Sequence, residues 1–179
     1  MSTKNIIILT AAGLVLAACH SKRPQQNIVS TQKSVTTEHV ENFFANYDIA
    51  DLDRNKVSTS EEIAKHEITV IDFWASWCGP CRGEMPVMVD MYDNYKDKGL
   101  GIIGISLDED YDAWKKAVDE DQMLWMQLSE LRGWDCTAAQ DNSVQAIPHT
   151  IVVDKRGKIL ATGLRGHELV EFVDKQLSK

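Results

Sequence analysis

The feature that most constrains this sequence is an apolar run that leads directly into a pair of cysteines. Residues 68–74 read Ile-Thr-Val-Ile-Asp-Phe-Trp, a composition typical of a buried β-strand. Residues 77–81 read Trp-Cys-Gly-Pro-Cys, and the spacing of an amphipathic helix follows them. Two thiols with two residues between them, placed where a strand leads into a helix, have the spacing of a redox motif.

The expected helix start explains why the two thiols should be reactive. Its unpaired N–H groups carry about half a positive charge, so Cys78 should ionise more readily than a free cysteine. Cys81 lies one turn further and can close a small disulfide ring, and Pro80 fits the first turn because no N–H is needed there. The alternatives are a structural disulfide or a zinc half-site, for which Cys136 and His149 would have to complete about four ligands.

The stretch from Val70 to Cys81 resembles the active-site segment of thioredoxin, through Asp-Phe-Trp-Ala at 72–75 and the cysteine motif at 77–81. The run Cys-Arg-Gly-Glu-Met-Pro that begins at Cys81, and the added N-terminal region, are more similar to the TlpA/ResA-like branch of the thioredoxin-like superfamily. That branch is membrane-anchored and related to the AhpC/TSA and Redoxin proteins. The resemblance covers about residues 56–179 and implies a thiol–disulfide oxidoreductase.

The resemblance also implies a reaction. Cys78 would attack a substrate disulfide as a thiolate, and Cys81 would resolve the mixed disulfide. The redox-active Cys78–Cys81 disulfide would then be the only redox group, with no cofactor. The Gly79-Pro80 dipeptide is that of thioredoxin, whose couple is strongly reducing, and it favours a reductase of protein disulfides.

Asp72 is a carboxylate inside an apolar strand, so burial is expected to raise its pKa. It precedes Cys78 by six residues and matches, by the resemblance, the buried acid of thioredoxin. In that role it would accept or relay the proton of Cys81. The alternative is an aspartate at the strand end that faces solvent.

The resemblance further implies a substrate-binding surface. Ile147 and Pro148 precede a strand, at the place where the family carries a cis proline that faces the cysteines. The backbone of Ile147 would then pair with an extended substrate peptide. Trp77, together with Gly79 and Pro80, is expected to form an exposed collar around Cys78, and Trp74 is expected in the core.

Three further side chains carry open alternatives. His149 either titrates near the thiols and tunes them or packs at the start of its strand. Glu84, in the first turns of the helix after the cysteines, either acts as an acid or only suits the helix dipole. Cys136 is either a buried free thiol, a third redox centre or half of an intermolecular disulfide.

The N-terminal region predicts export and a lipid anchor. An apolar run ends at Ala18 and is too short for a membrane span of about 20 residues, so residues 1–18 indicate a signal peptide. Leu-Ala-Ala-Cys ending at Cys19 resembles the bacterial lipobox and implies a lipid on that sulfur; a plain signal peptide is the alternative. The polar residues 19–37 are expected to tether the domain to the membrane, outside the cytoplasm in the cell envelope, where disulfides persist.

Charge and resemblance together limit the partners. A formal net charge of −8 argues against nucleic acid, whose phosphates need a basic face. The resemblance implies protein disulfides as substrates, an apocytochrome c in cytochrome c maturation among them, and a membrane thiol transporter as electron donor.

Two other functional classes stay open. A thiol peroxidase of the AhpC/TSA type shares the fold, but its usual Pro-x-x-x-Thr/Ser-x-x-Cys approach is missing because residues 70–77 contain no proline. A non-catalytic substrate-binding module would use the collar and the proline groove without turnover. The intact Cys78/Cys81 pair argues against that module.

The order of elements predicts an α/β protein with a thioredoxin-like fold, in which helices flank a central mixed β-sheet. An N-terminal extension over residues 38–55, with a short helix near 38–47, precedes the thioredoxin-like domain over 56–179. Strands are expected near 68–74, 100–107, 124–128, 150–154 and 158–162, with helices near 78–96, 111–118, 138–144 and 169–177.

One acidic segment matches part of a calcium-binding loop. Asp51, Asp53, Asn55 and Glu62 fall at positions 1, 3, 5 and 12 of an EF-hand loop, but Lys56 stands where the loop needs glycine. The preferred interpretation is a surface turn that leads into a short strand at Val57 and then a helix capped by Ser60.

Overall fold

The computed structural model describes residues 42–178 of the chain. The expected signal peptide over 1–18, the lipid site at Cys19 and the tether over 19–37 therefore lie outside the described residues. The first described residue, Asn42, falls inside the expected N-terminal extension.

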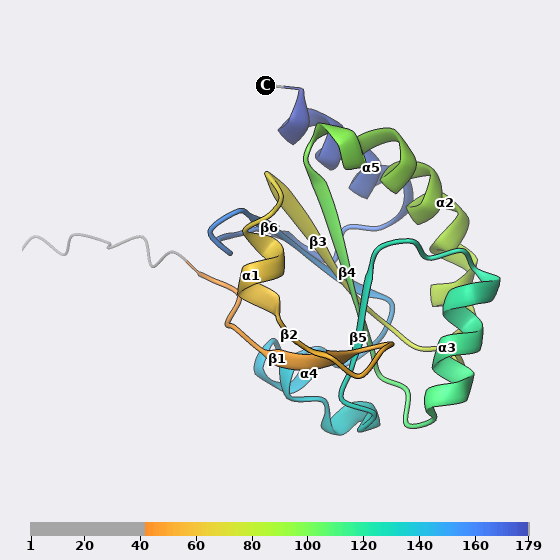
Figure 1. The fold of residues 1–179 in the computed structure, drawn as a ribbon. Coiled ribbons are helices and arrows are strands. Elements are labelled where there is room, and N and C mark those ends of the chain that lie inside the picture. Colours follow the sequence, from red (N-terminus) through yellow and green to blue (C-terminus); the bar gives the residue numbers. More distant parts are fainter. Residues whose placement is uncertain (1–41, 179) are drawn as a thin grey trace, which may run out of the picture. The chain divides into compact units, whose positions relative to one another are not determined.

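A mixed β-sheet of seven strands runs through the described residues (Figure 1). The strands are β1 (Asp48–Asp51), β2 (Lys56–Ser58), β3 (Ile68–Trp74), β4 (Leu100–Ser106), β5 (Met126–Ser129), β6 (His149–Asp154) and β7 (Ile159–Thr162). Their order across the sheet is β2-β1-β5-β4-β3-β6-β7. β3, β4 and β5 run parallel, and β6 lies antiparallel to β3 on its other side. The expected α/β class with a central mixed sheet is confirmed.

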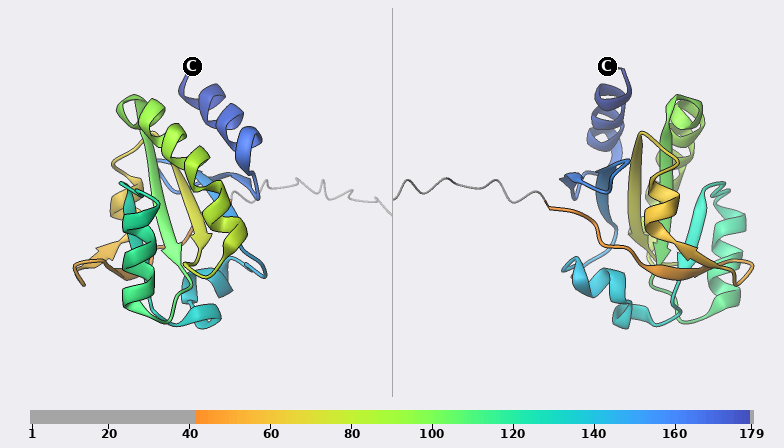
Figure 2. Two further views of the ribbon diagram at one scale, coloured as in Figure 1. Left: turned by 90° about the vertical axis from the view of Figure 1, so that its right-hand side faces the viewer. Right: turned by 60° about the vertical axis from the view of Figure 1, so that its left-hand side comes forward.

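Helices cover both faces of this sheet. They are α1 (Thr59–Ile63), α2 (Gly79–Tyr95), α3 (Tyr111–Glu120), α4 (Thr137–Asp141) and α5 (Gly166–Leu177), with two short 3₁₀ turns at Lys96–Lys98 and Gly133–Asp135. α2, α3 and α5 lie on one face, and α1 and α4 on the other (Figure 2). Within residues 42–178, no helix has both the length and the apolar character needed to cross a membrane.

The core lies on both faces of the central strands, and α2 covers one of these faces. β3 and β4 are buried along their whole length, as expected for parallel strands covered on both faces. α2 buries one stripe of side chains at spacings of three or four residues: Cys81, Met85, Met88 and Met91. Cys81 therefore belongs to the side of α2 that packs on the sheet.

The expected helix near 38–47 is wrong for the described residues 42–47. Phe43 instead forms an antiparallel bridge with Lys158. The Phe44 N–H donates to the Gly157 carbonyl at 2.9 Å, and the Ile159 N–H donates to the Asn42 carbonyl at 2.9 Å. The backbone groups of this segment therefore pair with the turn between β6 and β7. A few apolar residues at helical spacing fit such an extended segment as well as they fit a helix.

The acidic segment is a β-hairpin that leads into α1. The Asp51 carboxylate closes the turn itself, because its Oδ1 accepts the N–H groups of Asp53 and Asn55 at 2.9 and 2.8 Å. Glu62 lies in α1 and pairs with Lys65 at 2.5 Å. This confirms the expected turn and strand, but Ser58 rather than Ser60 caps the helix, because Ser58 has the extended backbone that an N-cap needs.

Candidate active site

Cys78 and Cys81 form a disulfide at the N-terminus of α2, with their Cα atoms 5.3 Å apart. Cys78 is the N-cap of the helix, and its sulfur accepts the Cys81 N–H at 3.2 Å. The sulfur therefore lies where the unpaired N–H groups of the helix concentrate positive charge. In the reduced protein the same N–H groups would stabilise a thiolate on Cys78.

The surface beside the disulfide is open and partly apolar. Trp77 has 57% of its surface exposed, and Gly79 and Pro80 are exposed as well. A Cβ atom added at Gly79 would meet nothing within 4 Å, so the glycine leaves free space at the first residue of α2. Trp74, in contrast, is fully buried and donates from Nε1 to Gln127 at 3.1 Å, as expected for a core residue.

The Ile147–Pro148 peptide bond is cis, as expected. β6 begins at the next residue, His149, which lies opposite Phe73 of β3. This register brings Pro148 to the end of β3 where the cysteine loop begins, although the two segments are distant in the chain.

Asp72 is a buried carboxyl group on the α2 side of the sheet. Only 3% of its surface is exposed, and burial raises its pKa to about 7, with Glu84 raising it and Arg165 lowering it. Glu84 belongs to α2 and Arg165 is the N-cap of α5, so Asp72 shares the face on which Cys81 is buried. The alternative of a solvent-facing aspartate is wrong.

An ion pair joins the two helices on this face. Nε of Arg165 donates to Glu84 Oε1 at 2.7 Å, and Nη2 of Arg165 lies 2.6 Å from the same oxygen. Sequence analysis singled out Glu84 and missed Arg165, because nothing around Arg165 in the chain indicates which acid it reaches. The pair places two opposite charges that act on Asp72.

The loop between β3 and α2 is held by side chains that sequence analysis also missed. Ser76 donates from its backbone N–H and from Oγ to Asp108, at 2.9 and 2.5 Å. Arg82 donates to Asp121 and, at 3.2 Å, to Glu120 at the end of α3. Asp108 follows the second apolar strand, and parallel strands bring their carboxyl ends to one edge of the sheet, so its position was a usable signal.

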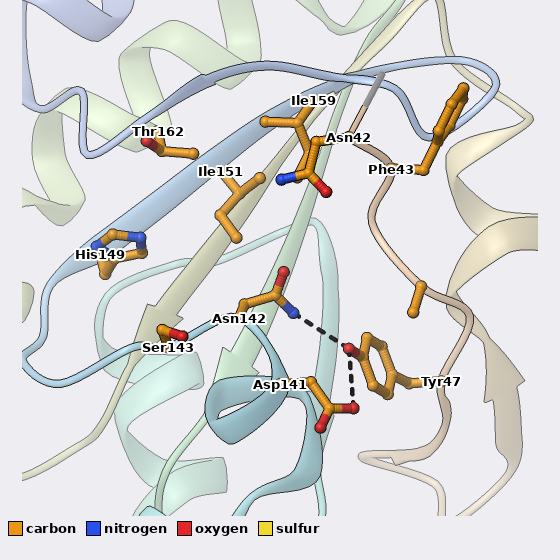
Figure 3. A pocket seen from close by; sticks show the side chains of 11 residues that line it. Asn42, Phe43, Tyr47, Asp141, Asn142, Ser143, His149, Ile151, Ile159 and Thr162 are labelled. Carbon is orange, nitrogen blue, oxygen red and sulfur yellow. Dashed lines mark hydrogen bonds between the residues drawn. The ribbon is translucent and has the colours of Figure 1, made fainter. Parts of the chain in front are cut away.

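His149 lies on the opposite face of the sheet from Asp72. Neighbouring residues of a strand point to opposite faces, and Thr150 rather than His149 lies opposite Asp72. The His149 ring lines a cleft of about 390 Å³ together with Ile151 (Figure 3), and burial lowers its pKa. This placement favours a histidine packed at the start of its strand.

The far wall of that cleft carries a tyrosine held by α4. Tyr47 donates its hydroxyl hydrogen to Asp141 at 3.3 Å and accepts from the Asn142 side-chain amide at 3.2 Å (Figure 3). Burial, and then the charge of Asp141, raise the pKa of Tyr47 to about 12. The cleft is therefore lined by groups that remain uncharged near neutral pH, apart from Asp141.

Cys136 is a free, buried cysteine at the start of α4. Burial raises the pKa of its thiol, which lies 3.8 Å from Glu130 Oε1. This confirms the expectation of a buried free thiol. Across residues 42–178, no three His, Cys, Asp or Glu side chains come together in a group that could hold a metal ion.

Comparison with known proteins gives this site a context. The model of the AhpC/TSA family matches residues 37–162. The thiol-disulfide oxidoreductase ResA of Bacillus thuringiensis is 28% identical over 134 residues, which cover 75% of this chain and 74% of that protein.

Two solved structures share the fold over most of the chain. The thioredoxin domain of a thiol-disulfide oxidoreductase from Bacteroides vulgatus is 34% identical, with a TM-score of 0.70. The alignment covers 76% of this chain and 96% of that domain. A thiol-disulfide oxidoreductase from Bacteroides fragilis is 27% identical, with a TM-score of 0.70. The alignment covers 75% of this chain and 98% of that structure.

Proposed function

The chain belongs to the AhpC/TSA family and is a thiol–disulfide oxidoreductase, and from this premise we propose that it reduces protein disulfides through Cys78 and Cys81. The observation that carries the proposal is the disulfide at the start of α2, whose Cys78 sulfur accepts the Cys81 N–H. Helix N–H groups aimed at one sulfur favour its thiolate, which is the form that attacks disulfides.

The first step transfers the substrate bond to Cys78. The Cys78 thiolate attacks one sulfur of the substrate disulfide, that S–S bond breaks, and the departing substrate sulfur leaves as a thiolate that takes up a proton. Cys78 is then joined to the substrate as a mixed disulfide. Trp77 and Pro80 are exposed beside it and offer apolar contacts to the bound chain.

The second step releases the substrate. Cys81 loses its proton and attacks the Cys78 sulfur, which re-forms the Cys78–Cys81 disulfide and expels the second substrate sulfur. Asp72 is the group proposed to take the Cys81 proton, because it is buried on the same face and its pKa of about 7 lets it act as a base near neutral pH.

An extended substrate peptide would be held by the backbone before the cis proline. Ile147 precedes Pro148 and lies beside the end of β3, where it can pair with a peptide strand that carries the target disulfide. Specificity would then come from the side chains around this strand, since backbone pairing is common to all sequences.

The proposed setting is the bacterial cell envelope, outside the cytoplasm, with the protein anchored to a membrane by a lipid. The lipobox-like sequence that ends at Cys19 supports a lipid anchor, and the polar residues 19–37 support a tether to the domain over 56–179. After each turnover the enzyme holds a disulfide, so it needs an electron donor. A membrane thiol transporter is the proposed donor, and an apocytochrome c is one proposed client.

Reduction of insulin by dithiothreitol tests the reductase activity. Catalysed precipitation that disappears in the Cys78→Ser variant is expected. The reduction potential of the pair should lie near that of thioredoxin, about −270 mV. A value near −120 mV would point to an oxidase, and consumption of peroxide without insulin reduction would favour the thiol peroxidase.

A further inference from the structure

A buried carboxylate next to the cysteine loop has no part in the two steps above. Asp108 follows β4 and has 1% of its surface exposed. Its Oδ2 accepts the Ser76 N–H at 2.9 Å and the Ser106 hydroxyl at 2.6 Å, and its Oδ1 accepts the Ser76 hydroxyl at 2.5 Å. Three donors aimed at two oxygens are what an ionised carboxylate accepts.

The direct partners of this carboxylate within residues 42–178 are neutral groups. Among the residues that the structure describes, no Lys, Arg or His forms an ion pair with Asp108. Arg82, which follows Cys81 in the chain, pairs with Asp121 and Glu120 and donates from Nη1 to the Ser76 carbonyl at 3.5 Å, so this cation lies beside Ser76 but forms no ion pair with Asp108. Asp108 is therefore a negative charge held in the protein by neutral hydrogen-bond donors.

The loop gives this charge a short connection to the nucleophile. Ser76 precedes Cys78 by two residues, and the Cys78 N–H donates to the Ala75 carbonyl at 3.0 Å. Both donors of Ser76 point at Asp108, so the carboxylate fixes the tight turn that ends at Cys78. Because the site is buried, water screens the charge of Asp108 only weakly.

We propose that Asp108 is a positioning residue for the dithiol: it clamps Ser76, and its negative charge opposes formation of the Cys78 thiolate. The charge acts against the helix N–H groups that favour the thiolate. A less stable thiolate makes the reduced protein a better electron donor, because a strong oxidant is one whose reduced form is stabilised. The inference rests on the proposed reductase function and explains how a reducing couple is kept.

The test compares two Asp→Asn variants in the same loop. Asp108→Asn removes the charge and keeps an oxygen for the Ser76 N–H. It is expected to lower the pKa of the Cys78 thiol and to lower the equilibrium constant for disulfide formation with glutathione about tenfold, or roughly 30 mV. Asp110→Asn is the matched control, because Asp110 is exposed and caps α3, which Asn also does well. It is expected to change the constant less than about twofold.

A second variant separates charge from loosening of the loop. Ser76→Ala keeps the carboxylate but removes a hydroxyl dipole that offsets its charge. It is expected to shift the same constant in the opposite direction, by about twofold. A clamp that acts only by rigidity would shift both variants in the same direction. Ser76→Ala also serves alone if Asp108→Asn does not fold, because a rise in the equilibrium constant is what the charge of Asp108 predicts for this variant.

The two proposals fail separately in this experiment. Equal constants for Asp108→Asn and Asp110→Asn, or the same direction of change in Asp108→Asn and Ser76→Ala, overturn the role of Asp108. An unchanged constant in Ser76→Ala overturns it as well. The potential of the unmodified protein alone decides whether the enzyme is a reductase, so an oxidising value with a tenfold effect of Asp108→Asn would leave the positioning role standing.

Discussion

The two faces of the central strands carry different chemistry, although they are built on adjacent residues. Asp72 on the α2 side is buried, and its pKa is raised to about 7. His149 on the α4 side is half-buried, and its pKa is lowered. The α2 side holds the Cys78–Cys81 pair, and the α4 side holds Cys136, which is buried and free.

The difference shows that the face of the sheet on which a side chain lies, rather than its distance along the chain, decides which titratable groups act together. β3 and β6 pair so that Thr150 lies opposite Asp72, while His149 lies opposite Phe73. Alternation of side chains then separates the acid from the histidine, although both stand at the same edge of the sheet.

Removing one thiol from each face should give the largest contrast. Cys78→Ser is expected to lower disulfide reduction by at least about 10³-fold, because the variant lacks the sulfur that attacks the substrate in the first step. Cys136→Ser should keep turnover within about twofold, since its thiol is buried away from substrate. Insulin reduction measures both, and a large loss in Cys136→Ser would contradict the separation of the faces.

Asp72→Asn should stabilise the protein at high pH. Asp72 has a pKa of about 7 when folded, against an ordinary value of 3.8, so the folded protein binds the extra proton between these values. Stability is therefore lost as the pH rises from about 4 to 7. Removing the group is expected to raise the free energy of unfolding by about 4 kcal/mol above pH 7, and by little below pH 4.

Denaturant titrations at pH 4 and pH 8 measure this effect. A pH-independent difference between the two proteins would show that Asp72 does not carry the shifted titration.

The same variant should slow the second chemical step. Asp72→Asn is expected to slow release of substrate from the mixed disulfide about 100-fold, because the proton of Cys81 loses its acceptor. In the unmodified protein this rate should rise with pH through about 7, as the Asp72 carboxyl group becomes a base. Stopped-flow measurements of the single-turnover rate test this, and an unchanged pH profile would exclude the role.

The Glu84–Arg165 ion pair should shift the pH dependence of substrate release, and its two members should shift it in opposite directions. Glu84 raises the pKa of Asp72 and Arg165 lowers it. Glu84→Gln is therefore expected to move the midpoint of the pH profile down, and Arg165→Gln to move it up, each by about half a unit. The two variants control for each other, because mere loss of the ion pair would move both midpoints the same way.

His149→Gln should have the smallest effect. Its ring lines the cleft on the α4 side, so the pH profile of substrate release should not change and turnover should stay within about twofold. The same stopped-flow measurement applies. A midpoint that moves in this variant would mean that the histidine acts on the thiols across the sheet.

Local patterns predicted the parts of the site that depend on one segment. The apolar run before the cysteines predicted β3, and the charge inside that run predicted a buried Asp72. The partners that hold the site come from distant segments: Asp108 reaches Ser76, and Arg165 reaches Glu84. Such contacts depend on how the strands and helices pack, so the pattern around each residue does not name its partner, although the place of Asp108 after the second apolar strand indicated the edge of the sheet at which it lies.

The errors at the N-terminal end have the same origin. Two adjacent phenylalanines fit a helix as well as an extended segment. The extended segment forms because the Phe44 N–H donates to the carbonyl of Gly157, which is distant in the chain. The cap of α1 moved from Ser60 to Ser58 because the β1–β2 hairpin sets where the extended backbone ends.

The most direct test of the account is capture of a mixed disulfide with the Cys81→Ser variant. Without the resolving thiol, the covalent intermediate should accumulate, and peptide mapping by mass spectrometry should place the substrate sulfur on Cys78 alone. An adduct on Cys136, or no adduct from a folded variant with a free Cys78 thiol, would contradict the account.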